Sequence, residues 1–219
     1  MSATGGKRRD AFRAWALVSL DAFLALTCLV VTGATQMFDD SALNQIYGSN
    51  TEETRVLFRY ISFAGSLWAV LAVTVAVTAI YLLMRKYWRA LFLSASVGAL
   101  WLIDEALKFS IARERPGLGS DAFGLGYSYP SGHTLVGMGM YFTIAILLSD
   151  ELREEGQRLA VWLFAGAIVF LIGLSRLVLG VHYPTDVLGS ALLGMAWTLT
   201  MMEFMRIYVR PAEKSLTRT

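Results

Sequence analysis

The sequence predicts an all-α membrane protein, a bundle of six transmembrane helices. Of its 219 residues, 56% are hydrophobic, and the mean hydropathy of +0.53 is higher than soluble domains usually reach. The apolar residues also gather into six long runs, and about 20 such residues let a helix cross a bilayer. These observations favour one integral membrane domain over two soluble domains.

Short polar segments separate the six runs. The first run follows basic residues, as a secretory signal does, but it is too long for one and five further runs come after it. The predicted spans are residues 14–35, 60–84, 88–110, 133–148, 159–179 and 185–208. They define a membrane domain, 14–208, between an N-terminal tail, 1–13, which we expect to be disordered, and a C-terminal tail, 209–219. A short amphipathic helix lying on the membrane is expected around residues 56–61.

The distribution of Lys and Arg predicts the orientation of the bundle, because cytoplasmic loops are enriched in both. With the N-terminus inside, 13 of the 19 Lys and Arg residues lie in inner segments. Six spans then return the C-terminus to the same side, so both termini are predicted to be cytoplasmic. Three polar segments that could carry chemistry would all lie at the outer face.

The first of these segments runs from Lys108 to Arg115-Pro116. A lysine at the end of a membrane helix is commonly an anchor at the interface, and an arginine in a loop is commonly a surface charge. The two cations could instead bind phosphate oxygens, Arg115 with its planar fork and Lys108 as a point charge.

The second segment is Pro130-Ser131-Gly132-His133, at the start of the fourth predicted span. Ser131 is a favourable helix N-cap, and free backbone N–H groups at a helix start suit an anion. Gly132 would let the backbone come close to that anion. A plain capped helix start with one polar histidine is the simpler reading.

The third segment begins with Ser175-Arg176 and ends with His182-Tyr-Pro-Thr-Asp186. An aspartate that accepts from one ring nitrogen of a histidine fixes the tautomer and leaves the other nitrogen free to attack. Pro184 suits the first turn of a helix, which places Asp186 near the start of the last span. The two histidines of the chain, His133 and His182, therefore both lie in motifs that suit phosphoryl transfer.

Several other residues receive structural interpretations. Asp21, inside the first span, should face the bundle interior or a polar partner, and Cys28 should be a small buried residue. Asp104 lies four residues before Lys108 on the same helix face, which predicts a structural partner for it. Two further predictions are a loop charge or a headgroup contact at Arg113, and interfacial aromatic residues at Tyr127 and Tyr129, which could also line the substrate entry.

The three motifs, Lys-x6-Arg-Pro, Pro-Ser-Gly-His and Ser-Arg-x5-His-x3-Asp, together resemble the signature of the phosphatidic acid phosphatase type 2 superfamily, without a substitution. The resemblance implies that His182 is the nucleophile and forms a phosphohistidine, that Asp186 orients it, and that His133 protonates the leaving group and then helps to activate water. It also implies that no metal or other cofactor is required. The residues that it assigns to the phosphate oxygens are Lys108, Arg115, Ser131, Gly132 and Arg176.

The predicted function is hydrolysis of a phosphomonoester or pyrophosphate of a membrane lipid. Six spans with the chemistry at the membrane surface suit a substrate whose tail stays in the bilayer. Undecaprenyl pyrophosphate, phosphatidylglycerol phosphate and phosphatidic acid are all open, as is a sugar phosphate. A phosphotransferase would share the first half-reaction, and an anion or lipid transporter is a third hypothesis. The expected partners are a phospholipid or polyprenyl phosphate and the bilayer of a bacterial inner (plasma) membrane, and no nucleic acid is expected.

Overall fold

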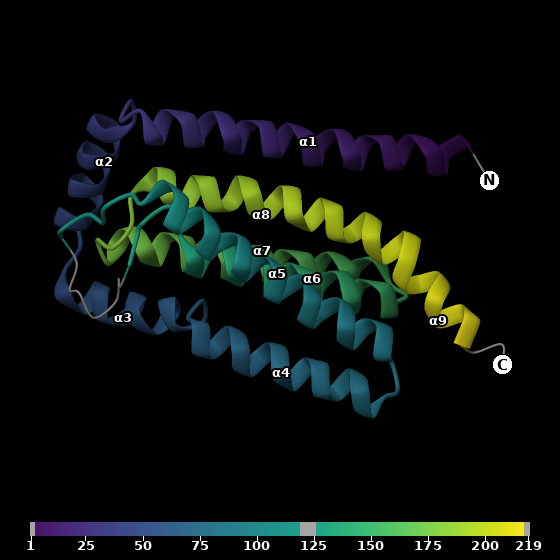
Figure 1. Ribbon diagram of the computed structural model, residues 1–219. Coiled ribbons are helices and arrows are strands. Elements are labelled where there is room, and N and C mark those ends of the chain that lie inside the picture. The colour runs from purple at the N-terminus through teal and green to yellow at the C-terminus, as the bar shows by residue number, and fades with distance from the viewer. Residues whose placement is uncertain (1–2, 119–125, 217–219) are drawn as a thin grey trace.

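The computed structural model describes residues 3–118 and 126–216, and every regular element within these ranges is a helix. Six segments are long and apolar enough to cross a membrane, which confirms the predicted fold class. The long helices lie roughly along one axis, and the two chain ends lie together at one end of the bundle (Figure 1). We call that end the terminal end and the opposite end the site end. The helices are α1 Ala3–Val31, α2 Gln36–Gly48, α3 Glu52–Phe63, α4 Leu67–Leu83, α5 Tyr87–Ile111, α6 Gly132–Glu151, α7 Glu155–Val178, α8 Pro184–Phe204 and α9 Arg210–Leu216, with a π-helical turn at Met205–Val209.

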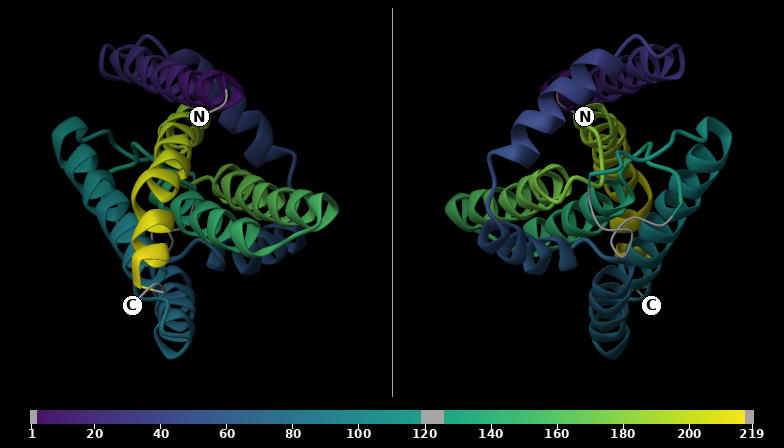
Figure 2. Two further views of the ribbon diagram at one scale, coloured as in Figure 1. Left: turned by 90° about the vertical axis from the view of Figure 1, so that its right-hand side faces the viewer. Right: turned by 90° about the vertical axis from the view of Figure 1, so that its left-hand side faces the viewer.

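Helix α6 is the centre of the bundle. In the most apolar stretch of α6, 67% of the residues are buried, whereas in those of α1 and of α3–α4 only 11% are buried. It contacts α4, α5, α7 and α8, and the end-on views show these helices around it, with α1 and α4 at opposite edges (Figure 2). The motif at the start of α6 is therefore surrounded by other elements rather than by lipid.

Two features of the first part of the chain were not predicted. The first helix begins at Ala3, so residues 3–13 continue it and do not form a disordered tail. A separate helix, α2, runs across the site end of the bundle between α1 and α3 (Figure 1). Its Met37 and Phe38 are exposed, as is expected of a helix at a membrane interface.

The predicted amphipathic helix around residues 56–61 corresponds to α3. Thr51 caps α3 by accepting from the Thr54 N–H, and Ser66 caps α4 by accepting from the Ala69 N–H. Residues 64–66 break the helix between these two caps, and α3 is inclined to α4 (Figure 2). A Cβ on Gly65 would come within 2.9 Å of the His133 carbonyl oxygen, so a glycine lets the break lie against the start of α6.

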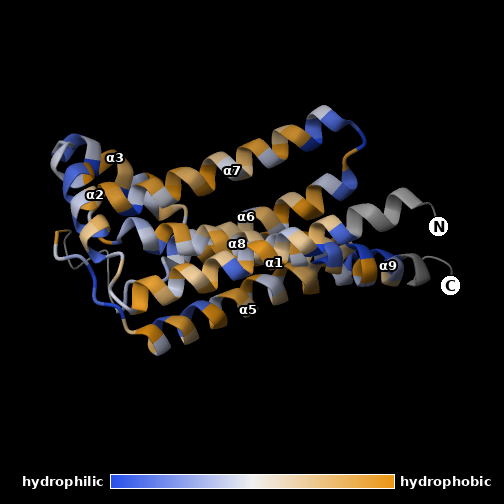
Figure 3. Ribbon diagram, turned by 90° about the horizontal axis from the view of Figure 1, so that it is seen from above, coloured by the Kyte–Doolittle hydropathy of each residue, from blue (hydrophilic) through white to orange (hydrophobic). Residues whose placement is uncertain are grey.

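The face of helix α1 that packs against the bundle is not the one that the sequence analysis predicted. Phe23 and Val30 are buried, and they share one face because residues seven apart lie about two turns apart. Asp21 and Cys28 lie on other faces and are exposed, so both predictions of burial were wrong. From residue 14 onward most α1 residues are apolar, as the hydropathy view shows (Figure 3), so hydropathy alone does not fix which face packs.

A cluster of ion pairs ties the helices together at the terminal end. The buried Arg89 of α5 donates to Asp150 at 2.6 Å, to Glu151 at 3.1 Å and to Glu213 at 2.8 Å. Arg210 also pairs with Asp150. Because Arg89 lies 19 residues before Lys108 on one helix, this cluster is roughly 29 Å from the site end at about 1.5 Å per residue.

Candidate active site

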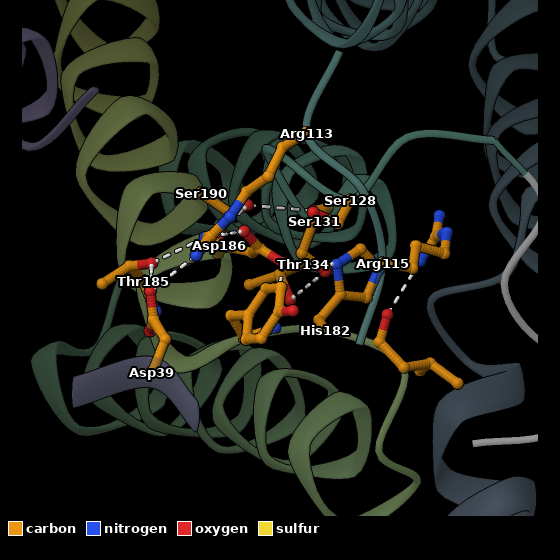
Figure 4. A network of polar contacts seen from close by, with 12 residues as sticks. Asp39, Arg113, Arg115, Ser128, Ser131, Thr134, His182, Thr185, Asp186 and Ser190 are labelled. Atoms are coloured by element: carbon orange, nitrogen blue, oxygen red, sulfur yellow. Dashed lines mark hydrogen bonds and ion pairs between the residues drawn. The ribbon is translucent and has the colours of Figure 1, made fainter. Parts of the chain in front are cut away.

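All three predicted motifs meet at the site end, around a cavity of about 190 Å³. Six predicted site residues line it together with an acidic pair on α5, and His182 is only 1% exposed. The close-up shows the polar contacts behind the cavity (Figure 4). The polar and glycine lining consists of Gly65, Asp104, Glu105, Lys108, Arg115, Gly132, His133, Arg176 and His182.

His182 lies in the short link between α7 and α8 and is held at both ring nitrogens. Its Nδ1 is 3.2 Å from Asp186 Oδ2, and its Nε2 is 3.0 Å from Arg115 Nη1. A guanidinium can only donate, so Nε2 accepts and the ring proton lies on Nδ1. Burial, together with the nearby Arg115 cation, lowers the pKa of His182 well below 6.5. The site therefore presents a neutral imidazole whose Nε2 lone pair points toward cations.

Asp186 occupies the third position of α8, which begins with Pro184. Its Oδ2 accepts the backbone N–H of Tyr183 at 2.9 Å in addition to His182. Its Oδ1 accepts from Arg113 Nη1 at 2.6 Å. The carboxylate is fully buried, and with three donors its orientation toward His182 is closely defined.

The predicted cations reach the cavity from three elements. Lys108, in the last turn of α5, pairs with Asp104 at 2.5 Å and Glu105 at 3.4 Å, so Asp104 is the partner that the spacing predicts. Ala112 ends α5 in the left-handed conformation, and the chain then turns so that Arg115 donates to the carbonyl oxygens of Gly126 and Val181. Burial lowers the pKa of Arg115.

Arg176 comes from the last turn of α7 and is 1% exposed. Its Nη1 donates to the hydroxyl of Ser62 on α3. The positive groups thus come from α5, the following loop and α7, which together surround the two histidines. Charge of this sign in a site shielded from water would attract a phosphate.

The start of α6 brings Gly132 and His133 to the cavity wall. A Cβ on Gly132 would lie 2.6 Å from Asp104 Oδ2 and 2.7 Å from Lys108 Nζ, so a glycine is needed for the ion pair to lie against the helix. Ser131 takes the N-cap position. Its hydroxyl hydrogen-bonds to Thr134 Oγ1 at 3.1 Å, and among the described lining residues Ser131 does not appear.

The sequence interpretation missed the role of Arg113. Its guanidinium bridges Asp186 and Asp39 of α2, at 2.6 and 2.7 Å, so it is not a loop charge. Burial alone would lower the pKa of Arg113, but the Asp186 and Asp39 carboxylates raise it above the ordinary value. Asp39 was one of several acids in a polar segment, and nothing in its local sequence marked it.

Tyr129 is also buried rather than interfacial. Its ring stacks on Phe23, and its hydroxyl hydrogen-bonds to Thr27 Oγ1 at 2.8 Å. Burial raises the pKa of Tyr129 to about 12. Tyr127 is 39% exposed and meets Phe109 edge-on, which agrees better with an interfacial position.

Comparison with known proteins identifies the family of this site. Residues 86–210 match the model of the PAP2 superfamily, and this range contains all three motifs. The chain belongs to the PAP2 superfamily. It is 30% identical over 174 residues to phosphatidylglycerophosphatase B of Bacillus subtilis (strain 168), a match that covers 79% of this chain and 86% of that protein.

Two further relatives agree with this assignment. The crystal structure of a transmembrane PAP2-type phosphatidylglycerolphosphate phosphatase from Bacillus subtilis superimposes with a TM-score of 0.82 at 28% identity, covering 88% of this chain and 96% of that one. Lipid A 1-phosphatase of Rhizobium johnstonii is 32% identical over 131 residues, 54% of this chain and 49% of that protein. The chain is therefore a membrane lipid phosphatase of the PAP2 superfamily.

Proposed function

We propose that this protein hydrolyses the terminal phosphomonoester of phosphatidylglycerol phosphate, with His182 as the nucleophile and without a metal ion. One observation carries the proposal: the Nε2 atom of a neutral, carboxylate-held histidine faces a small cavity lined by Lys108, Arg115 and Arg176. The named activities of the similar Bacillus subtilis proteins support this substrate.

In the first step, Nε2 of His182 attacks phosphorus while the bond from phosphorus to the lipid alcohol breaks. His133 donates a proton to the departing oxygen, and Asp186 stabilises the positive charge that develops on His182. In the second step, water attacks the phosphohistidine, His133 takes the proton from the water, and the N–P bond breaks. Inorganic phosphate leaves and His182 is regenerated.

The cations replace the charge stabilisation that a metal ion often supplies to a phosphoryl group in transfer. Arg115 donates to the His182 Nε2 atom, so a phosphate must take over that guanidinium before Nε2 can attack. Lys108 and Arg176 bind the other equatorial oxygens. The start of α6, where Ser131 is the N-cap and Gly132 the first helical residue, contributes backbone N–H groups to the same phosphate.

The space available supports a lipid substrate. A cavity of about 190 Å³ is smaller than the roughly 300–1,000 Å³ of pockets that enclose whole ligands, so it holds little more than the phosphate group. An apolar groove of about 570 Å³ between α4 and α5 adjoins it, and Leu67, Val70, Trp101 and Val136 line both. The hydrocarbon chain of the lipid would lie in this groove while its phosphate enters the cavity.

The same proposal sets the protein in a bacterial inner membrane with the site end outside. Lys and Arg are more frequent in the segments at the terminal end, which favours a cytoplasmic position for both termini. Residues 14–208 then form the membrane-embedded catalytic domain, and the segments 1–13 and 209–219 extend it on the cytoplasmic side.

The test is release of phosphate by the purified protein in detergent and EDTA. Phosphatidylglycerol phosphate, undecaprenyl pyrophosphate and phosphatidic acid are compared, with His182→Ala as the inactive control. We expect release that EDTA does not reduce, that is fastest with phosphatidylglycerol phosphate and that is lost in a His182→Ala protein with an unchanged melting temperature. An active His182→Ala protein would refute the mechanism, and a preference for another lipid would refute the substrate.

A lipid phosphotransferase makes the same first step, so the products must be identified as well. Mass spectrometry after reaction in the presence of glycerol and phospholipid acceptors separates the two reactions. Free phosphate as the main product supports hydrolysis, whereas phosphorylated acceptor with little free phosphate would favour transfer.

A further inference from the structure

We propose that Arg113 and Asp39 form a positioning pair that sets the orientation of Asp186, and through it the ring of His182. Neither residue is a fixed position of the three motifs, and neither lies among the described residues that line the cavity. The inference rests on the proposed function, because it assigns Asp186 and His182 the roles given above.

The contacts of Arg113 make it the centre of this arrangement. Nη1 donates to Asp186 Oδ1 at 2.6 Å and to Thr185 Oγ1 at 2.8 Å. Nη2 donates to Asp39 Oδ2 at 2.7 Å. The guanidinium also lies over the Tyr183 ring, 4.2 Å from its centroid. A planar group held on two edges and one face has little freedom to rotate.

Asp39 links helix α2 to the first turn of α8. Its Oδ1 accepts the Thr185 N–H at 3.0 Å, and its Oδ2 accepts the Thr185 hydroxyl at 2.6 Å. Asp39 thereby satisfies a backbone donor that helix starts leave unpaired. Its neighbours on α2, Met37 and Phe38, are exposed, whereas Asp39 is 0% exposed, so this acid points inward from an otherwise peripheral helix (Figure 4).

The charges explain why the two residues act together. Asp39 and Asp186 are both fully buried, and like-charged carboxylates in such a site are unfavourable without a cation between them. Arg113 supplies that cation. It also occupies Asp186 Oδ1, which leaves Oδ2 to accept from His182 Nδ1 and the Tyr183 N–H. Asp39 holds the far side of the guanidinium and so acts on Asp186 through Arg113.

A double-mutant cycle tests this order of action. Because a hydrogen bond to a charged group contributes about tenfold to a hundredfold in an equilibrium or rate, we expect Arg113→Gln to lower kcat about 100-fold and Asp39→Asn about 10-fold. KM should stay within about twofold, because neither residue touches the substrate cavity. The double variant should be no worse than Arg113→Gln alone, and Arg113→Lys should retain more activity than Arg113→Gln. Losses that multiply in the double variant would refute the pair.

Arg89→Gln is the matched control. Arg89 is also a buried arginine between carboxylates, but it lies at the terminal end. The same substitution there should lower the melting temperature to a similar extent and leave kcat unchanged. If Arg89→Gln lowers kcat as much as Arg113→Gln does, the effect is loss of stability and the proposal fails.

A second measurement does not depend on any lipid substrate. Because the chain has only two histidines, ¹⁵N-histidine labelling gives signals from His133 and His182 alone, and His133→Gln assigns them. The wild-type His182 should carry its proton on Nδ1. Arg113→Gln, Asp39→Asn and the double variant should each lower the Nδ1–H fraction, the double no further than Arg113→Gln. An unchanged tautomer would refute the proposal, whereas inactivity of the wild type on every lipid would refute only the proposed function.

Discussion

Replacing Gly132 with alanine should impair catalysis more than it impairs folding. The added Cβ would lie 2.6 Å from Asp104 Oδ2 and 2.7 Å from Lys108 Nζ, whereas ordinary contact begins at 3.4 Å. The ion pair must therefore retreat by 3.4 − 2.6, or about 0.8 Å, with Lys108 at the end of a flexible chain. A misplacement of about 1 Å in an active site can cost about 100-fold in rate, or roughly 2.7 kcal/mol.

The assay is phosphate release at a range of lipid concentrations, together with the melting temperature in the same detergent. We expect kcat/KM of Gly132→Ala to fall about 10- to 100-fold, and overpacking to cost about 1–3 kcal/mol of stability at most. Gly166→Ala is the control, because a Cβ there meets nothing within 4 Å and alanine should stabilise the helix by about 0.5–1 kcal/mol. Full activity of Gly132→Ala would refute the idea that Lys108 must lie against the start of α6.

Three further predictions concern the pH dependence of stability, the hydrogen bond between Tyr129 and Thr27, and the apolar groove between α4 and α5. In the unfolded protein His182 binds a proton near pH 6.5, whereas burial and Arg115 keep its pKa in the folded protein well below that value. The free energy of unfolding should therefore fall as the pH drops below 6.5, by at most about 1.4 kcal/mol per pH unit. The wild type should lose more melting temperature than His182→Ala between about pH 7.5 and 5.5, and equal losses would contradict this. Tyr129→Phe removes the hydrogen bond to Thr27 and should cost about 0.5–1.5 kcal/mol in thermal unfolding; an unchanged melting temperature would argue against an anchoring role. Gly98 lines the α4–α5 groove with open space beside it. Gly98→Leu should therefore raise KM for a long-chain lipid and not for a short-chain analogue. Equal changes in KM would mean that the hydrocarbon chain of the lipid lies outside this groove.

The sequence was sufficient to predict the six-helix bundle and the family. Runs of apolar residues are a one-dimensional signal, so the six spans could be predicted, and an even number of spans brings both chain ends to one end of the bundle. The membership predicted from the three motifs is confirmed by the family match. The catalytic roles of His182, His133 and Asp186 stay predictions, although the structure brings the three segments together around one cavity.

The contacts between distant segments could not be predicted in the same way. Arg113 and Asp39 are 74 residues apart, and their pairing depends on how α2 crosses the site end. Tyr129 was placed at the interface because aromatic residues are common there, but its burial depends on the packing of α1. The exposure of Asp21 likewise follows from the rotation of α1, whose residues 14–31 are mostly apolar, and hydropathy does not determine that rotation.

The family match begins at residue 86, yet several contacts on the site come from residues before it. Asp39 reaches Arg113 and Thr185, and Thr27 reaches Tyr129. A chimera that joined residues 86–210 to the first helices of another protein would carry every motif and lose these contacts. Exchanging the helices before residue 86 should thus change the catalytic rate, although every motif residue stays the same.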